Sequence, residues 1–193
     1  MVKEQDQKQS IEWMRAYQAG KVGAFESLYE FLRPVLYQYL LYKTFNASLS
    51  EDLLQEAFLQ IHRSRRTYMP GKPVLPWALA IARNVFLMDC RARSRRRRHE
   101  VFVEEYLPEA ASTSPFEGIA ERQTVRRALA QLTPDQREIL LMHHALGLNF
   151  SEIAGVLGIL RSTAKLRAHR AIKILRKVLG ITGVTDERQE QIN

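Results

Sequence analysis

The sequence predicts an all-α protein, built as two small helical domains joined by a flexible linker. Apolar residues recur at helical spacing along almost the whole chain, and no run of alternating β-branched residues indicates a strand. At 193 residues and 46% hydrophobic content, the chain can bury one core or two small ones. Segment 99–115 is acidic and aperiodic and is rich in Ser, Thr, Ala and Pro, as linkers are. We therefore expect a first domain over 1–98, a second over 116–179, and a polar tail over 180–193.

The apolar periodicity predicts a series of helices. They cover residues 8–19, 22–45, 51–66, 76–97, 117–131, 134–146, 150–157 and 162–179. Thr133 is followed by Pro134 and, three residues after Thr133, by Gln136, which is the pattern of a capped start with Pro in the first turn. Asn149 and Glu152 resemble a capping box in which Asn replaces Ser or Thr. These caps favour helices that begin near residues 134 and 150.

Composition excludes several classes of site. The single cysteine, Cys90, excludes an internal disulfide and a zinc site built from several cysteines. No segment approaches the roughly 20 apolar residues that span a bilayer, and the N-terminus lacks a basic start followed by an apolar run. The five His are scattered and the carboxylates do not cluster as a metal site or an acid–base pair would require. We expect a cytoplasmic protein that is not an enzyme, with no catalytic residue, metal or cofactor.

Positive charge is gathered into two patches rather than spread evenly. The net charge of +8 includes +10 over residues 61–98 and +7 over 161–177, while residues 99–120 carry −5. Each patch continues an apolar periodic helix, so neither is a low-complexity tail. This distribution is typical of a protein that contacts a polyanion at two places.

The second patch has the length and spacing of a helix-turn-helix. Helix 150–157, a turn at Gly158 and helix 162–179 follow one another as in motifs whose second helix lies in the major groove. Its predicted core stripe contains Ala164, Ala168, Ala171, Ile172, Leu175, Val178 and Leu179. The opposite face holds Ser162, Leu166, His169, Arg170 and Lys173. The candidate DNA contacts are these five residues together with Arg161 at the start of the patch and Thr163, Lys165 and Arg167 on the flanks.

Leu166 is an apolar side chain in the middle of this cationic face. It could touch a thymine methyl group or a protein partner, or it could be an isolated exposed Leu without a role.

In the first patch, helix 76–97 is expected to bury a stripe on which one acid, Asp89, also falls. The apolar members of the stripe are Ala78, Ile81, Ala82, Val85 and Met88. A carboxylate in such a place is more often held by an arginine, here Arg93 one turn on, than used in catalysis. The opposite face presents Arg83, Asn84, Leu87, Arg91, Ser94 and Arg98. This mixture of amide, apolar and guanidinium groups suits a nucleic acid with exposed bases.

The loop over 65–77 mixes aromatic, basic and turn-forming residues, and three prolines stiffen it. Its candidate contacts are Tyr68, Lys72 and Trp77, and such a loop could receive an unstacked base. The alternative is a plain connector in which Trp77 is buried.

Helix 51–66 differs from both basic helices because its exposed face is acidic. Its buried stripe is predicted to contain Leu54, Ala57, Phe58 and Ile61. Asp52, Gln55, Glu56, Leu59 and Gln60 remain outside. DNA would repel this face, which favours a protein partner over a nucleic acid, with a solvated surface as the alternative.

Four stretches of the chain together resemble the bacterial sigma-70 family, in its extracytoplasmic-function group. They are Asp52 to Leu59, Pro76 to Asn84 with Asp89 and Arg91, Leu132 to Arg137, and Glu152 to Ala154 with Thr163 to Ala171. The resemblance covers about residues 20–179 in the right order and spacing. It departs from the common recognition-helix motif at Leu160, Ser162, Ala164 and Leu166, where relatives commonly have Pro, Gly, Val and Ser.

The resemblance implies a promoter-specificity subunit of bacterial RNA polymerase. In such a protein, Asp52, Gln55, Glu56 and Leu59 would face the clamp coiled coil of the largest catalytic subunit of the polymerase. Helix 76–97 and the preceding loop would engage the −10 element and hold the non-template strand open, with Asn84 near an unpaired base. Helix 162–179 would read the −35 element, and the linker would run toward the active-site and RNA-exit channels. Such factors are often silenced by an anti-sigma protein, so we expect one as a partner.

Two rival interpretations remain at the level of sequence. A dimeric helix-turn-helix regulator explains residues 121–179 but gives no role to the acidic helix or to the loop over 65–77. An enzyme acting on nucleic acid should supply clustered carboxylates or a nucleophile with a base, and Asp89 is a lone acid.

Overall fold

The computed structural model describes residues 4–99 and 128–180, and within these ranges every regular element is a helix. The elements are α1 (Glu4–Gln18), α2 (Ala24–Thr44), α3 (Ala47–Ser64), the 3-10 turn η1 (Arg65–Thr67), α4 (Val74–His99), α6 (Pro134–Leu140), the π-helical turn η2 (Leu141–Ala145), α7 (Phe150–Leu157) and α8 (Arg161–Val178). The all-α prediction is confirmed. The predicted linker after His99, the predicted tail after Gly180 and most of the predicted helix 117–131 lie outside the described residues.

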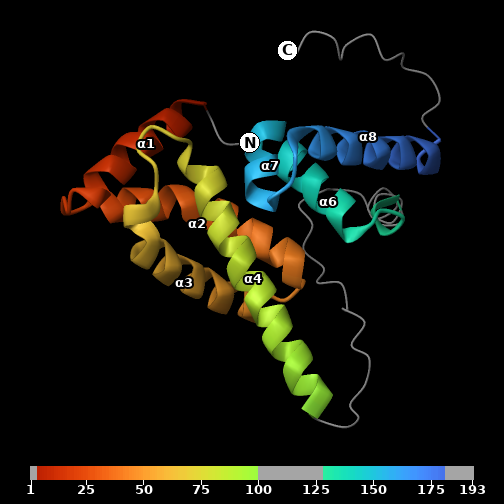
Figure 1. The fold of residues 1–193 in the computed structure, drawn as a ribbon, viewed down its shortest axis with the longest axis horizontal. Coiled ribbons are helices and arrows are strands. Elements are labelled where there is room, and N and C mark those ends of the chain that lie inside the picture. Colours follow the sequence, from red (N-terminus) through yellow and green to blue (C-terminus); the bar gives the residue numbers. More distant parts are fainter. Residues whose placement is uncertain (1–3, 100–127, 181–193) are drawn as a thin grey trace.

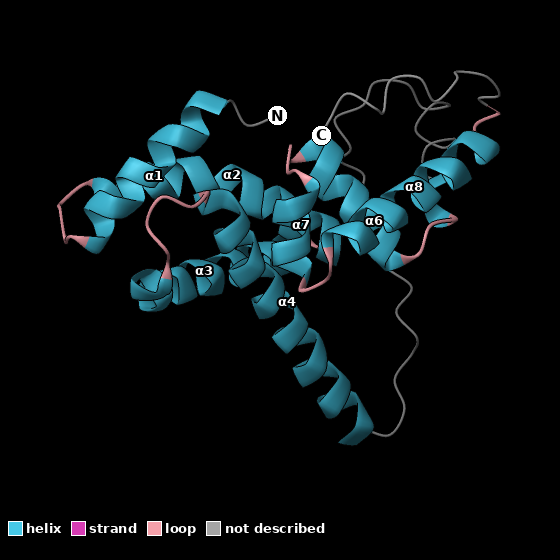
Figure 2. Ribbon diagram, turned by 45° about the horizontal axis from the view of Figure 1, so that its top comes forward, coloured by secondary structure: helices cyan, strands magenta, loops and turns pink. Residues whose placement is uncertain are grey.

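The first four α-helices form the N-terminal domain. α2 packs against α1, α3 and α4, and its buried residues include Leu36, Tyr39 and Leu40, none of which is exposed. The last turns of α4 extend away from the other helices, as both views show (Figures 1 and 2). The arginine-rich end of α4 is therefore carried on a projecting helix.

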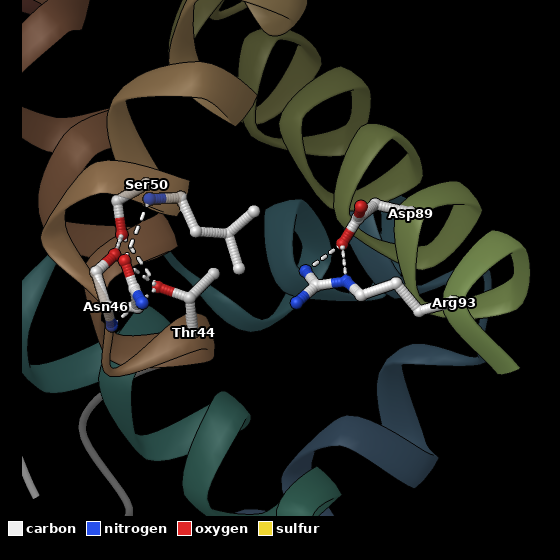
Figure 3. Close-up of polar contacts among 6 residues, drawn as sticks. Thr44, Asn46, Ser50, Asp89 and Arg93 are labelled. Atoms are coloured by element: carbon white, nitrogen blue, oxygen red, sulfur yellow. Dashed lines mark hydrogen bonds and ion pairs between the residues drawn. The ribbon is translucent and has the colours of Figure 1, made fainter. Parts of the chain in front are cut away.

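The junction between α2 and α3 explains why α3 begins four residues before the predicted start at residue 51. Phe45 adopts a left-handed conformation with φ of 52°, which ends α2. The side chain of Asn46 then accepts a hydrogen bond of 2.9 Å from the amide of Leu49 and caps α3. The hydroxyl groups of Thr44 and Ser50 lie 2.7 Å apart and join the two helix ends (Figure 3). An Asn cap in a stretch without strong apolar periodicity was the signal that the sequence reading missed.

The C-terminal domain contains α6, η2, α7 and α8. Both predicted capping boxes are present, at Thr133 with Gln136 and at Asn149 with Glu152. The helix expected over 134–146 changes to a π-helical turn at Leu141, where the Leu146 amide bonds the carbonyl of Leu141 at 3.1 Å. Gly158, with φ of 66°, ends α7 and turns the chain into α8. The helix-turn-helix expected from the sequence is thus formed.

The two domains are in direct contact. α7 packs against α4 of the N-terminal domain and against α8 of its own domain. A single cluster of buried side chains continues from the N-terminal domain into the C-terminal domain, where it includes Ile139, Met142, Leu148 and Ile153. The views agree that α7 lies between the N-terminal helices and α8 (Figures 1 and 2). The sequence reading did not foresee this docking.

Candidate nucleic-acid and protein interfaces

α8 presents the cationic face that the sequence predicted. Ala164, Ala168 and Ala171 are fully buried and let α8 lie close to α6 and α7. On the other side, the exposed predicted contacts are Arg161, Ser162, Lys165, Leu166, His169, Arg170 and Lys173. Leu166 is 49% exposed, so an apolar side chain does stand within the cationic surface. The predicted core stripe is wrong at Val178, which is 41% exposed, because Ala171, Ile172 and Leu175 make the contact with α6 before the last turn.

Two predicted flank residues of α8 are half-buried, Thr163 and Arg167. The Arg167 guanidinium donates a hydrogen bond of 2.7 Å to the carboxylate of Asp135 in the first turn of α6. A phosphate contact by Arg167 would therefore have to share or replace this ion pair.

The face of α4 is only partly available. Asn84 and Arg91 are exposed and Leu87 is half-buried, so all three have surface that a partner could contact. Arg83 instead turns toward the other domain, where its Nε donates to a carboxylate oxygen of Glu138 at 3.2 Å. The side chain of Arg98 lies outside the described residues.

The predicted core stripe of α4 needs a correction. Met88, assigned to the core, is 64% exposed, whereas Leu79, left out of the stripe, is completely buried. The reason is that α4 packs against several helices, α2, α3 and α7, so that its buried surface is broader than one stripe and shifts along the helix.

Asp89 is held by an arginine, as expected. Arg93 donates to one oxygen of Asp89 through Nε at 2.8 Å and also through Nη2 (Figure 3). This pair, one turn apart on α4, is an ion pair within a single helix.

The loop between η1 and α4 is built around Tyr68. The prediction that Tyr68 is an accessible contact for a base was wrong. Tyr68 is 3% exposed, so it cannot stack on a base from this position. Its ring packs edge-on against Trp77 with centroids 5.5 Å apart, and its hydroxyl donates to the carbonyl of Lys72. Burial raises the pKa of the Tyr68 hydroxyl. Trp77 is half-buried, while Lys72 and Met69 are exposed and form the accessible part of the loop.

Gln18, at the end of α1, fixes the start of this loop. Its Nε2 donates to the carbonyl of Arg65 at 2.7 Å and to that of Tyr68 at 3.0 Å. Sequence reasoning missed Gln18 because its partners are 47 and 50 residues away along the chain.

The predicted acidic face of α3 is exposed in part, because Glu56 and Gln60 are half-buried. Asp52, Gln55 and Leu59 reach solvent, and Leu59 is 52% exposed. Glu56 is half-buried and accepts a hydrogen bond of 2.7 Å from the side chain of Gln60. A groove of about 860 Å³ lies between α3 and α4, and Glu56, Met88 and Asp89 are among its lining residues. The α3 face and this groove form one surface suited to a protein partner.

Glu138 on α6 is a charged residue that the sequence reading did not single out. It is 3% exposed and accepts hydrogen bonds from Tyr39 (2.6 Å) and Arg83 (3.2 Å), with Lys43 Nζ at 3.1 Å. All three partners belong to the N-terminal domain. Burial, followed by the neighbouring Glu138 carboxylate, raises the pKa of the Tyr39 hydroxyl, so Tyr39 remains a donor.

Within 4–99 and 128–180, no helix is both long enough and apolar enough to span a bilayer. The same residues contain no group of three or more His, Cys, Asp or Glu placed to hold a metal ion.

Comparison with known proteins identifies both domains. The family model described as "Sigma-70 region 2" matches residues 28–96, and "Sigma-70, region 4" matches residues 122–175. The RNA polymerase sigma factor CarQ of Myxococcus xanthus is 35% identical over 173 residues, covering 86% of this chain and 95% of CarQ. The ECF RNA polymerase sigma factor EcfG of Rhodopseudomonas palustris is 32% identical over 141 residues, covering 73% of this chain and 77% of EcfG.

Solved structures share the fold. The sigma factor RpoE, in complex with the anti-sigma factor NepR from Bartonella quintana, superposes with a TM-score of 0.69 at 24% identity. That match covers 84% of this chain and all of RpoE. CnrH, in complex with the cytosolic domain of CnrY, gives a TM-score of 0.63 at 18% identity, covering 90% of this chain and 99% of CnrH. With region 2 and region 4 matched in order, and relatives matched over most of their length, the chain belongs to the extracytoplasmic-function group of the sigma-70 family of RNA polymerase sigma factors.

Proposed function

We propose that this alternative sigma factor binds core RNA polymerase through α3, engages the −10 element through α4 and the loop before it, and reads the −35 element with α8. Region 2 then corresponds to a domain over 1–98 and region 4 to a domain over 116–179, with 99–115 as the linker. The protein acts in the cytoplasm, where polymerase and promoter are, and contributes binding surfaces rather than a catalytic group.

The observation that carries this proposal is the face of α8. Three buried alanines bring α8 close to its neighbours, so its opposite side stands out with exposed Lys165, Arg170 and Lys173. A helix-turn-helix that offers such a face fits the major groove, where guanidinium groups read guanine and apolar groups contact thymine methyls. Leu166 on this face supports a −35 preference different from that of relatives with Ser there.

The surface of α4 supports the proposed contact with the −10 element. Exposed Asn84 and Arg91, with half-buried Leu87 between them, combine an amide, a cation and an apolar group. Such a mixture suits an opened strand, whose bases offer both hydrogen-bonding edges and stacking faces. Among the loop residues, Lys72 is accessible for a backbone contact, and half-buried Trp77 offers only part of its ring.

The composition of the α3 face supports the proposed binding of a protein partner. Asp52, Gln55 and exposed Leu59 join acidic, amide and apolar groups in a surface that DNA would repel. Two of the solved structures that share the fold are complexes, RpoE with NepR and CnrH with the cytosolic domain of CnrY. By analogy, an anti-sigma protein controls this chain and competes with polymerase for its surfaces.

The test is promoter-specific initiation. The purified chain is added to core bacterial RNA polymerase on a genomic DNA library, and the 5′ ends of the transcripts are sequenced. Shared −35 and −10 motifs upstream of the starts are the expected result. Absence of specific starts, together with absence of binding to core polymerase, would contradict the proposal. Protection of a palindromic duplex site by the chain alone would instead support the dimeric regulator.

A further inference from the structure

Glu138 joins the two domains through a buried charge. Among the residues whose burial is described, it is the one charged side chain that is fully buried, at 3% exposure. Its carboxylate receives Tyr39 and Lys43 from α2 and Arg83 from α4, while its own helix, α6, belongs to region 4. Buried charges persist only when they are paired and hydrogen-bonded, and these three groups satisfy both requirements.

The docked arrangement cannot bind both promoter elements at once. About 25 base pairs separate the −35 and −10 positions, which is about 85 Å of duplex at 3.4 Å per step. Region 2 and region 4 are in contact here, with Tyr39 Oη 2.6 Å from the Glu138 carboxylate. A compact 100-residue domain has a radius of gyration of only about 13 Å. The domains must therefore separate before α4 and α8 reach their elements.

The covalent chain permits this separation. Residues 100–127 connect α4 to the described part of region 4, and at about 3.4 Å per residue their extended length is about 95 Å. The chain length thus does not hold the domains together, and the non-covalent contacts between them decide whether the molecule is open or closed.

The Glu138 contact also occupies a cation that the proposed function needs. The Arg83 side chain is 22% exposed and its Nε is committed to Glu138, although Arg83 lies on the helix proposed to bind the −10 element. Lys43, 14% exposed, is directed at the same carboxylate and lies 5.1 Å from the centre of the Phe86 ring of α4. Two cations around one carboxylate make a site whose charge and donors would also suit a DNA phosphate.

We propose that Glu138 is an internal competitor of promoter DNA: it latches region 4 onto region 2, and polymerase or DNA must displace it before Arg83 and Lys43 become available. In the free protein, this surface of region 2 binds the chain's own region 4. In the promoter complex, the same surface binds the phosphate backbone of the DNA. This inference rests on the proposed function, because it regulates the same α4 surface.

The test uses the full chain carrying Glu138→Gln. The amide keeps the size and one acceptor of the side chain but removes the charge, which leaves Lys43 and Arg83 partly buried without a counter-charge in the closed form. Opening returns both cations to water, so the equilibrium shifts toward separated domains. The matched control is Glu152→Gln in α7, which removes the same charge from region 4. Gln is a normal partner in a capping box, as Gln136 shows, so this control keeps the α7 cap.

Two measurements without polymerase decide the question. Small-angle scattering should give a larger radius of gyration for Glu138→Gln than for the wild type and for Glu152→Gln. Binding of a fluorescent mixed-sequence single-stranded DNA should tighten by about tenfold or more, the gain expected if over about 90% of the wild type is closed. Wild-type values of both quantities in Glu138→Gln would overturn the latch. If Glu138→Gln loses helicity by circular dichroism, Tyr39→Phe, which removes one donor to the same carboxylate, should shift both quantities in the same direction by less.

Failure of the latch is separable from failure of the proposed function. Specific initiation with core polymerase is measured for the wild type and for Glu138→Gln in parallel. Equal initiation by both, without any change in size or in single-strand binding, removes the latch and keeps the sigma-factor function. Absence of initiation by both chains counts against the proposed function itself.

Discussion

Arg167 and Arg170 are three residues apart on α8 but have different environments. Arg167 is half-buried and paired with Asp135, whereas Arg170 is exposed on the proposed groove face. Arg170→Ala should therefore weaken binding of the holoenzyme to −35 duplex by about 1–3 kcal/mol and relax the preference at one base pair. Arg176→Ala, which removes an exposed charge near the end of the same helix, is the control. Equal losses for both variants would indicate a general charge effect rather than base reading.

Asn84 is the exposed amide of the α4 face, and unlike its neighbour Arg83 it is not turned toward Glu138. If it holds an unpaired base, its contact forms only after the strands separate. Asn84→Ala should accordingly slow promoter opening while leaving initial binding close to the wild-type level. Permanganate reactivity of exposed thymines measures the first step and electrophoretic mobility the second, with Cys90→Ala on the same helix as the control. A normal permanganate signal in Asn84→Ala would remove this role.

At the scale of elements, α1 is tied to the loop that precedes α4. Gln18 donates two hydrogen bonds to loop carbonyls, and each such bond contributes about 1 kcal/mol. Gln18→Leu keeps much of the volume and removes both donors, so we expect a loss of about 1–3 kcal/mol in the free energy of unfolding. Urea denaturation measures it, with Gln9→Leu on an exposed position of α1 as the control. A stability equal to that of Gln9→Leu would show that the loop is held by Tyr68 and its surroundings without Gln18.

The acidic face of α3 is the element proposed to bind polymerase. Glu56→Lys reverses a charge there and removes the acceptor of the Gln60 amide, a helix-surface contact of about 0.2–0.5 kcal/mol. The fold should therefore remain, while the affinity for core polymerase falls. Affinity is measured by titration into labelled core enzyme, and Glu30→Lys, on an exposed position of α2, makes the same charge change elsewhere. Retention of wild-type affinity in Glu56→Lys would argue against α3 as the docking face.

Over the whole molecule, helix positions followed from local chemistry and were predictable. The capping boxes, the buried alanines of α8 and the Asp89–Arg93 pair all depend on residues within a few positions of each other. What the sequence did not reveal depends on distant partners. Glu138 meets Tyr39 and Arg83 from 99 and 55 residues away, and Gln18 meets the carbonyls of Arg65 and Tyr68 from 47 and 50 residues away. A helical period indicates that a face is buried, but it does not say how many neighbours bury it or which domain supplies them.

The closed form and the DNA complex should respond differently to salt. Binding of DNA by exposed residues such as Lys165 and Lys173 releases counterions, so affinity for a −35 duplex should fall steeply between about 50 and 200 mM salt. The Glu138 ion pairs are largely shielded from solvent, with Lys43 14% and Arg83 22% exposed, and buried pairs are screened much less.

Small-angle scattering of the free chain should therefore give a constant radius of gyration over the salt range in which duplex binding is lost. Contacts between apolar side chains across the two domains should also keep the molecule closed as salt rises, because salt does not weaken them. A radius of gyration that rises in parallel with the loss of DNA affinity would mean that exposed charges, rather than the buried carboxylate and its apolar surroundings, hold region 4 on region 2. A constant radius, combined with opening in Glu138→Gln, would place the closing force in the buried contact.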